Sequence, residues 1–389
     1  MKTLIVLLAL AVVGLVSACG GGPPGSPAGP VSRAPTRAAE SPADVCNFEP
    51  HSFLPSPIAG ARPDLGSTPY PPISLSMPSI LAALADGSAP KLIGSGQSPV
   101  WSPDGTRIAF TTNIRGGLGG MFDIAVSDVE TTSSRTVARA TWSDTDLAGP
   151  LAWSPDGCFV AFEDLGYGYV VRADGSEPPL PIFSGSITSW SPTEDVIAFP
   201  ESGSLRVHLL ELDTGVQRPL PAFRLVIWSR DGERVLYEDS ATTSRDKTDF
   251  YVLDVNADEP RLVYSHPGLA PLNGVEEAAW SPDGTRIALL VPTSGPPCPE
   301  PGRTWGSDCN PSDVTVIDVS GAAAAVVVGQ GSWPVKWSPD GASVVFHRIE
   351  GEEAWFFAAP ADGSAQARMF LQAWDLSWSP AGDRLLLVR

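Results

Sequence analysis

The residues of this chain that could do chemistry are mainly carboxylates, and their spacing favours structural roles. One set recurs directly before a glycine in a Ser-Pro-Asp-Gly phrase: Asp104, Asp156, Asp283 and Asp340. Aspartate in a tight turn accepts hydrogen bonds from backbone amides, so we interpret this set as turn residues rather than metal ligands. Glu276 and Glu277 are neighbours, and side chains that are adjacent in a strand point to opposite faces. They are therefore poorly placed for paired acid–base catalysis.

The usual linear signatures of catalysis and cofactor binding are missing from this sequence. It contains no Gly-x-Ser-x-Gly elbow, no His-Glu-x-x-His and no Gly-x-x-x-x-Gly-Lys-[Ser/Thr] loop. The histidines are scattered and no Cys-x-x-Cys pair occurs, which argues against a metal site built from them. We therefore predict no catalytic residue, no cofactor, no bound metal and no enzyme activity.

The N-terminus indicates export. Lys2 precedes an apolar run over residues 4–16 that is too short for a permanent membrane span, and the run ends in Val-Ser-Ala-Cys. This ending resembles a bacterial lipobox, which implies a signal peptide over residues 1–18 and lipidation of Cys19. An ordinary signal peptide, cleaved after Ala18, is the alternative.

Residues 19–78 have the composition of a tether. Fourteen of the chain's 40 prolines fall between residues 20 and 78, together with many Gly, Ala and Ser, so this segment cannot bury a core. Whether residues 51–77 pack on the following domain stays open.

Four cysteines remain after Cys19, an even number that suits an oxidising compartment. Cys298 and Cys309 lie in one insertion rich in Pro and Gly, so we expect a disulfide between them. Cys46 and Cys158 are then left to pair by elimination. Metal binding by these cysteines is the weaker alternative.

A ten-residue phrase of the form Trp-Ser-Pro-Asp-Gly followed by an apolar strand occurs seven times and dictates the fold. The copies begin at Trp101, Trp153, Trp190, Trp228, Trp280, Trp337 and Trp378. Successive tryptophans lie between 37 (190 − 153) and 57 (337 − 280) residues apart, around the length of a four-stranded blade. A third strand ending in an Asp/Gly turn and a short apolar fourth strand follow in each unit.

The ends of the array predict how it closes. The last copy leaves room for two strands only, whereas residues 79–87 and 91–93 have the pattern of a third and a fourth strand. Pairing these N-terminal strands with the C-terminal ones completes an all-β, seven-bladed propeller of antiparallel blades over residues 79–389. Closure by both termini leaves only short protected edges.

The repeated Trp-Ser-Pro-Asp-Gly-x-x-[Ile/Leu]-Ala-[Phe/Leu] pattern resembles the WD-repeat-like propeller repeat of the TolB family. The likeness covers residues 79–389. It implies the propeller architecture and a habit of binding partners, without identifying the partner. Residues 193–194, Arg230 and Ala381 depart from the pattern and are expected to relax individual turns. The α/β domain that precedes the propeller of TolB has no counterpart here.

We place binding on the face that carries the longer loops and the links between blades, because function usually sits on variable loops. The candidates near the expected channel mouth are Gln97, Arg224, Glu276, Glu277, Trp333, Trp374 and Asp375. Trp333 and Trp374 would be aromatic anchors, with the arginine and the acids setting specificity. The alternative for both tryptophans is that they fill space between blades.

The net charge of −19 argues against nucleic acid and anionic membrane surfaces as partners. The interpretation that we prefer is a monomeric lipoprotein of the bacterial envelope, facing the periplasm or the exterior, that binds a protein or an envelope polymer. It would meet the membrane through its lipid alone. A glycan lyase or hydrolase that uses channel carboxylates, and a purely structural scaffold, are the alternatives.

Overall fold

The computed structural model describes Cys46, Pro50 and residues 77–389, except 116–119, 142–150, 186–188, 201–205, 221–223, 240–246, 258, 268–276, 294–311 and 351–352. The compact unit that holds the strands runs from Cys46 to Arg389. The described residues form antiparallel strands and no helix. In that part of the chain no helix long and apolar enough to cross a membrane therefore occurs.

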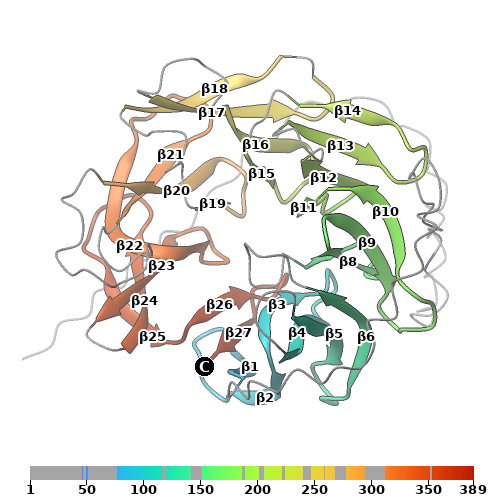
Figure 1. The fold of residues 1–389 in the computed structure, drawn as a ribbon. Coiled ribbons are helices and arrows are strands. Elements are labelled where there is room, and N and C mark those ends of the chain that lie inside the picture. The colour runs from blue at the N-terminus through green and yellow to red at the C-terminus, as the bar shows by residue number, and fades with distance from the viewer. Residues whose placement is uncertain are drawn as a thin grey trace, which may run out of the picture. The chain divides into compact units, whose positions relative to one another are not determined.

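The strands form four-stranded sheets in the predicted order (Figure 1). The first three complete sheets contain β3 (Gln97–Trp101), β4 (Arg107–Arg115), β5 (Met121–Asp128) and β6 (Ser134–Thr141); β7 (Ala152–Trp153), β8 (Phe159–Asp164), β9 (Tyr167–Arg172) and β10 (Leu180–Ser184); and β11 (Ser189–Trp190), β12 (Val196–Pro200), β13 (Val207–Glu211) and β14 (Gln217–Pro219). The fourth contains β15 (Arg224–Trp228), β16 (Arg234–Asp239), β17 (Lys247–Asp254) and β18 (Arg261–Pro267).

Two further blades share one long strand. The strands are β19 (Glu277–Trp280), β20 (Arg286–Pro292), β21 (Ser312–Asp318), β22 (Val326–Trp337), β23 (Ser343–Glu350), β24 (Glu353–Pro360) and β25 (Arg368–Gln372). The first half of β22, up to Gly331, pairs with β21, and the second half, from Ser332, pairs with β23. β22 is therefore the outermost strand of the fifth blade and the innermost strand of the sixth.

The last blade joins the two ends of the array, as predicted. β1 (Ser79–Leu84) and β2 (Lys91–Ser95) lie beside β26 (Asp375–Trp378) and β27 (Arg384–Val388), in the order β2-β1-β27-β26 (Figure 1). Ile80 pairs with Val388 and Leu84 with Arg384. The indole Nε1 of Trp101 donates to the carbonyl of Ser377 at 3.4 Å, which links the first blade to the last.

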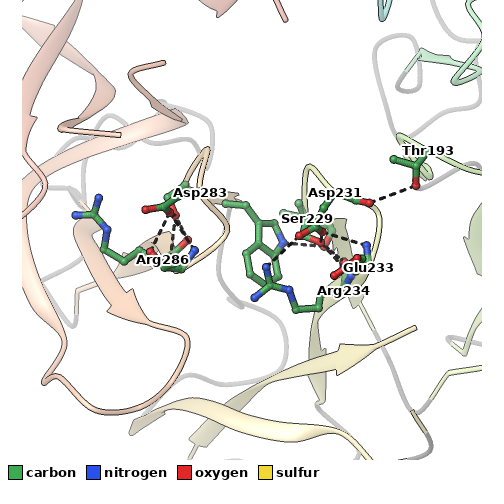
Figure 2. Close-up of polar contacts among 11 residues, drawn as sticks. Thr193, Ser229, Asp231, Glu233, Arg234, Asp283 and Arg286 are labelled. Carbon is green, nitrogen blue, oxygen red and sulfur yellow. Dashed lines mark hydrogen bonds and ion pairs between the residues drawn. The ribbon is translucent and has the colours of Figure 1, made fainter. Parts of the chain in front are cut away.

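The Ser-x-Asp-Gly turns confirm the structural role of their aspartates. In the fifth blade Asp283 accepts hydrogen bonds from the Ser281 hydroxyl at 2.6 Å and from the Thr285 amide at 3.0 Å (Figure 2). These bonds hold the pKa of Asp283 at about 2, below its ordinary value. Gly284 has φ of +66°, a conformation that other residues rarely adopt.

Tryptophan and arginine together join neighbouring blades. The Nε1 of Trp337 donates to the Ala279 carbonyl of the preceding blade at 2.9 Å. The guanidinium of Arg286, also in that blade, lies 4.8 Å from the centre of the Trp337 ring and donates to the Gly341 carbonyl at 2.7 Å. Arg107 repeats both contacts on the first and second blades, with Trp153 and Gly157. These motif tryptophans thus pack between blades, and arginine adds a cation–π contact to that packing.

The third copy of the motif departs from this pattern, and the departure destabilises the folded protein at neutral pH. Its residues 193–194 replace Asp-Gly, and Asp195 follows where the first and fifth copies have threonine. One carboxyl oxygen of Asp195 is buried without a hydrogen-bond partner. Burial raises the pKa of Asp195 to about 6, with the charges of Asp156 and Asp213 as smaller causes. The folded protein therefore holds a proton there that the unfolded chain releases near pH 3.8.

We predict that Asp195→Asn stabilises the protein at pH 7.5 and has little effect at pH 4. Because the pKa is higher in the folded state, the wild type loses stability as the pH rises from about 4 to 6. Since Asp195 is only half buried, the full linkage energy is discounted for solvent screening to about 1 kcal/mol. Thermal unfolding of both proteins across this pH range measures it. Parallel pH profiles for the two proteins would contradict the assignment.

Candidate functional site

The pairing of strands defines two faces of the ring of blades. The innermost strand of each blade ends in a motif tryptophan that enters a tight turn beginning with serine, of the form Ser-x-Asp-Gly in five of the seven copies; these strands are β3, β7, β11, β15, β19, the second half of β22, and β26. We call the face that carries these turns the turn face. The opposite face, which we call the loop face, carries the starts of the innermost strands and the connections between the second and third strands of the blades.

The structure brings the predicted site residues to the loop face at different blades. Gln97, Arg224, Glu277 and Asp375 begin the innermost strands of four blades. Trp333 lies in β22 and Trp374 directly precedes β26. Glu276 lies outside the described residues. These positions recur three or four residues before the motif tryptophans, which explains why sequence spacing alone located them.

Trp374 is the most prominent of them, because 57% of its surface is exposed. It borders a hollow of about 300 Å³ that Glu353, Gln372 and Arg389 also line. Its backbone amide donates to the Val388 carbonyl at 2.8 Å, which fixes the position from which the indole projects. The exposed indole does not fill space between blades, in contrast to Trp337, of which 6% is exposed.

The polar groups around this hollow are held in place by the framework. The guanidinium Nε of Arg389 donates to the Gln372 carbonyl at 2.8 Å, and Glu353 accepts a hydrogen bond from the Trp355 indole at 3.1 Å. The hollow therefore combines an aromatic surface with a fixed cation, a carboxylate and an amide. Such a set suits recognition of a mixed polar and apolar surface.

Asp375 is a different kind of candidate from Trp374. Its carboxylate accepts the amide of Leu376 at 2.7 Å. Burial raises the pKa of Asp375, while the positive charge of Lys336 on the neighbouring blade lowers it in part. A partly buried carboxyl with a raised pKa near a positive charge is a feature of acid–base sites as well as of structural pairs.

Three loop-face carboxylates that the sequence interpretation missed support the framework. Asp123 accepts from Arg139 at 2.7 Å, Asp249 from Ser265 at 2.6 Å and Asp313 from Gln330 at 2.9 Å. In each case the partner is the residue directly opposite on the outermost strand. The recurrence of aspartate within the first three residues of the third strands is the signal that could have revealed them.

The structure describes one of the two expected cysteine pairs. Cys46 and Cys158 form a disulfide with a Cα–Cα distance of 5.8 Å, as elimination had suggested. Asp156 lies near both sulfur atoms, but a disulfide offers no thiolate to a metal ion, so this cluster is not a metal site. Cys298 and Cys309 lie outside the described residues, so their pairing stays a prediction.

No protein-family model matches the chain, and no curated protein matches its sequence. Among solved structures, the chain is similar to TolB from Acinetobacter baumannii, with 16% identity over 80% of this chain and 63% of that chain and a TM-score of 0.43. Hydrazine synthase of Kuenenia stuttgartiensis has 14% identity over 75% of this chain and 94% of that one, with a TM-score of 0.51. A periplasmic gluconolactonase of Pseudomonas aeruginosa has 16% identity over 80% and 99%, with a TM-score of 0.48.

These similarities correct one prediction and confirm another. The prediction that the chain is not an enzyme is wrong as it stood. It rested on missing linear motifs, and the gluconolactonase and an oligogalacturonate lyase of Vibrio parahaemolyticus have the same kind of propeller. The resemblance to TolB-like, WD-repeat-like propellers is confirmed at the level of the fold. The part of the chain that the structure describes is thus an all-β propeller.

Proposed function

We propose that this protein is an envelope-anchored propeller that binds a protein or another envelope component through its loop face. The observation that carries the proposal is the exposed indole of Trp374 beside a hollow with fixed polar groups. Buried contacts of aromatic and arginine side chains supply most of the binding energy in protein interfaces, and this hollow offers both types.

The anchor and the compartment belong to the proposal as well. The signal peptide over residues 1–18, lipidation at Cys19 and the tether up to residue 78 would hold residues 79–389 at a membrane surface. The Cys46–Cys158 disulfide supports an oxidising compartment outside the cytoplasm. The net charge of −19 favours a partner with a basic surface over an acidic one.

Chemical crosslinking in intact cells, followed by affinity purification and mass spectrometry, tests the proposal. We expect one dominant partner with the wild type and at least a tenfold loss of it with Trp374→Ala, which corresponds to the removal of a strong interface anchor. Met369→Ala is the matched control, because Met369 is 53% exposed and apolar on the outermost strand of the sixth blade.

Two outcomes would contradict the proposal. Equal recovery of the partner by both variants would exclude the Trp374 hollow as its binding site. If no protein is crosslinked, sedimentation with isolated cell-wall polymer tests the other class of partner. Failure of the wild type to sediment with that polymer would then overturn the proposal.

A second candidate function, an enzyme that acts on glycans or sugar lactones, is favoured by Asp375. Its partly buried carboxyl and Lys336, whose charge acts on it, are the acid–base pair that such a reaction could use. Incubation with uronate oligosaccharides and aldonolactones, with product detection by mass spectrometry, tests it. Turnover by the wild type and its loss in Asp375→Asn would support the enzyme, and no turnover of either class would oppose it.

A further inference from the structure

Arg230, on the turn face, stands in the one motif copy that lacks proline at this position. The other six copies have Pro103, Pro155, Pro192, Pro282, Pro339 and Pro380. The turn that contains Arg230 is nevertheless formed normally, since Gly232 has φ of +72° and the Glu233 amide donates to Asp231 at 3.0 Å (Figure 2). The turn itself therefore does not require the arginine.

The arginine reaches instead to another blade. Its Nη2 donates to the carbonyl of Pro380 at 2.5 Å, which joins the turn of the fourth blade to the turn of the seventh. Arg230 lines a hollow of about 340 Å³ whose other walls come from the fifth, sixth and seventh blades. We call this the turn-face hollow.

The walls of the turn-face hollow combine flat apolar rings with positive charge. Trp280, Trp337 and Trp378 line it with prolines of the same turns, and Lys336 is its second cationic residue. No acidic side chain is among the described residues that line it. The turn aspartates nearby accept hydrogen bonds within their own turns, as the Ser281–Asp283 and Ser338–Asp340 contacts show.

We propose that the turn-face hollow is a second binding site, which takes a small ligand whose carboxylate is carried by a ring. A guanidinium has five N–H donors, and the contact with Pro380 uses one of them. A carboxylate can accept two parallel hydrogen bonds from the guanidinium and brings a full negative charge, whereas the Pro380 carbonyl accepts one bond and is neutral. The partly buried indole of Trp378 and the proline rings of the turns offer apolar surfaces against which a ring can pack, whereas Trp280 and Trp337 are buried between blades.

The acidic character of the whole protein sets the expected strength. A net charge of −19 repels anions at long range, so we expect weak binding, with dissociation constants of roughly 0.1–1 mM for a singly charged ligand.

Ligand-detected NMR and calorimetry with two pairs of probes test the proposal. Benzoate against benzamide, and glucuronate against glucose, differ chiefly in the carboxylate and separate an aromatic from a sugar ring. We expect at least one acid to bind the full-length protein, and its neutral counterpart to bind at least tenfold more weakly. Absence of binding by both acids would overturn the proposal.

Three variants assign the site. Arg230→Pro introduces the residue that the six other turns have, so we expect this variant to fold. Arg230→Gln is the substitute if it does not, because glutamine keeps a side-chain hydrogen-bond donor. We expect either to weaken binding at least tenfold. Arg135→Gln is the matched control, because Arg135 also donates to a carbonyl of another blade, that of Asp174 at 2.9 Å, outside this hollow. Undiminished binding by the Arg230 variants, or equal loss with Arg135→Gln, would contradict the assignment.

Discussion

Ending the chain at Asp383, which removes β27, should abolish folding of the whole ring of blades. β27 pairs with β1 on one side and with β26 on the other. Its residues Leu385, Leu386 and Leu387 are at most 1% exposed, and burial of each contributes about 2 kcal/mol. The free energy lost with these three buried side chains and with the pairing to β1 and β26 is comparable to the whole stability of a typical domain, which is about 5–15 kcal/mol. Soluble yield and a thermal unfolding scan measure the effect.

Point variants separate this effect from a general response to mutation. Leu386→Ala should fold with a melting temperature lowered by several degrees, since a buried leucine costs about 2–5 kcal/mol when truncated. Val216→Ala, at a position that is 53% exposed, should change it little. If the truncated protein keeps the main unfolding transition of the wild type, closure by β27 does not stabilise the ring.

Removal of the Cys46–Cys158 disulfide should lower stability by about 3 kcal/mol. The bond joins residues 112 positions apart, and closing a loop of that length restricts the unfolded chain strongly. Cys46 also packs against the buried cluster of Cys158, Phe159 and Ile182. For a protein of this size the loss corresponds to a melting temperature lower by about 5–10 °C. Differential scanning calorimetry of Cys46→Ser/Cys158→Ser under oxidising conditions measures it.

The control for the disulfide is the same measurement with reductant. The wild type should fall to the melting temperature of the double variant, whereas the double variant should shift less. Equal melting temperatures of wild type and double variant without reductant would show that the bond does not hold Cys46 to the second blade in the protein as purified.

The repeat made most of the fold predictable, because each copy contains the end of one strand, a turn and the next strand in that order. The seven tryptophans and the leftover strands at residues 79–93 were enough to infer closure by the two ends. Serine in the motif was overlooked, although it occurs in all seven copies. Ser102 is fully buried and its hydroxyl donates to Asp104 and accepts the Arg107 amide at 2.9 Å, so it fastens the turn to the next strand.

Contacts between blades were harder to predict than contacts within them. Arginine follows the turn in four copies and was assigned no role from the sequence, but Arg286 lies over the ring of Trp337, 51 residues later in the chain (337 − 286). Arg230 was expected only to relax its turn, and it contacts Pro380 on another blade. Neither contact has a signature in local spacing, because each depends on how the blades are stacked.

The sequence predicted the positions of the loop-face residues better than it predicted their roles. Counting back from the motif tryptophans located the starts of the innermost strands and with them Asp375 and Trp374. Sequence could not decide whether Trp374 is buried, since tryptophan serves both interiors and interfaces. Its exposed fraction of 57% is the observation on which the proposed function depends.

Site-specific photocrosslinking tests the proposed binding through the loop face most directly. A photoreactive phenylalanine analogue placed at position 374 reports on the loop face, and the same residue placed at the exposed Asp362, in a turn between the third and fourth strands of the sixth blade, reports on the turn face. The account predicts a crosslinked adduct of defined mass from position 374 in intact cells and none from position 362. Adducts from position 362 alone, or equally from both, would contradict it.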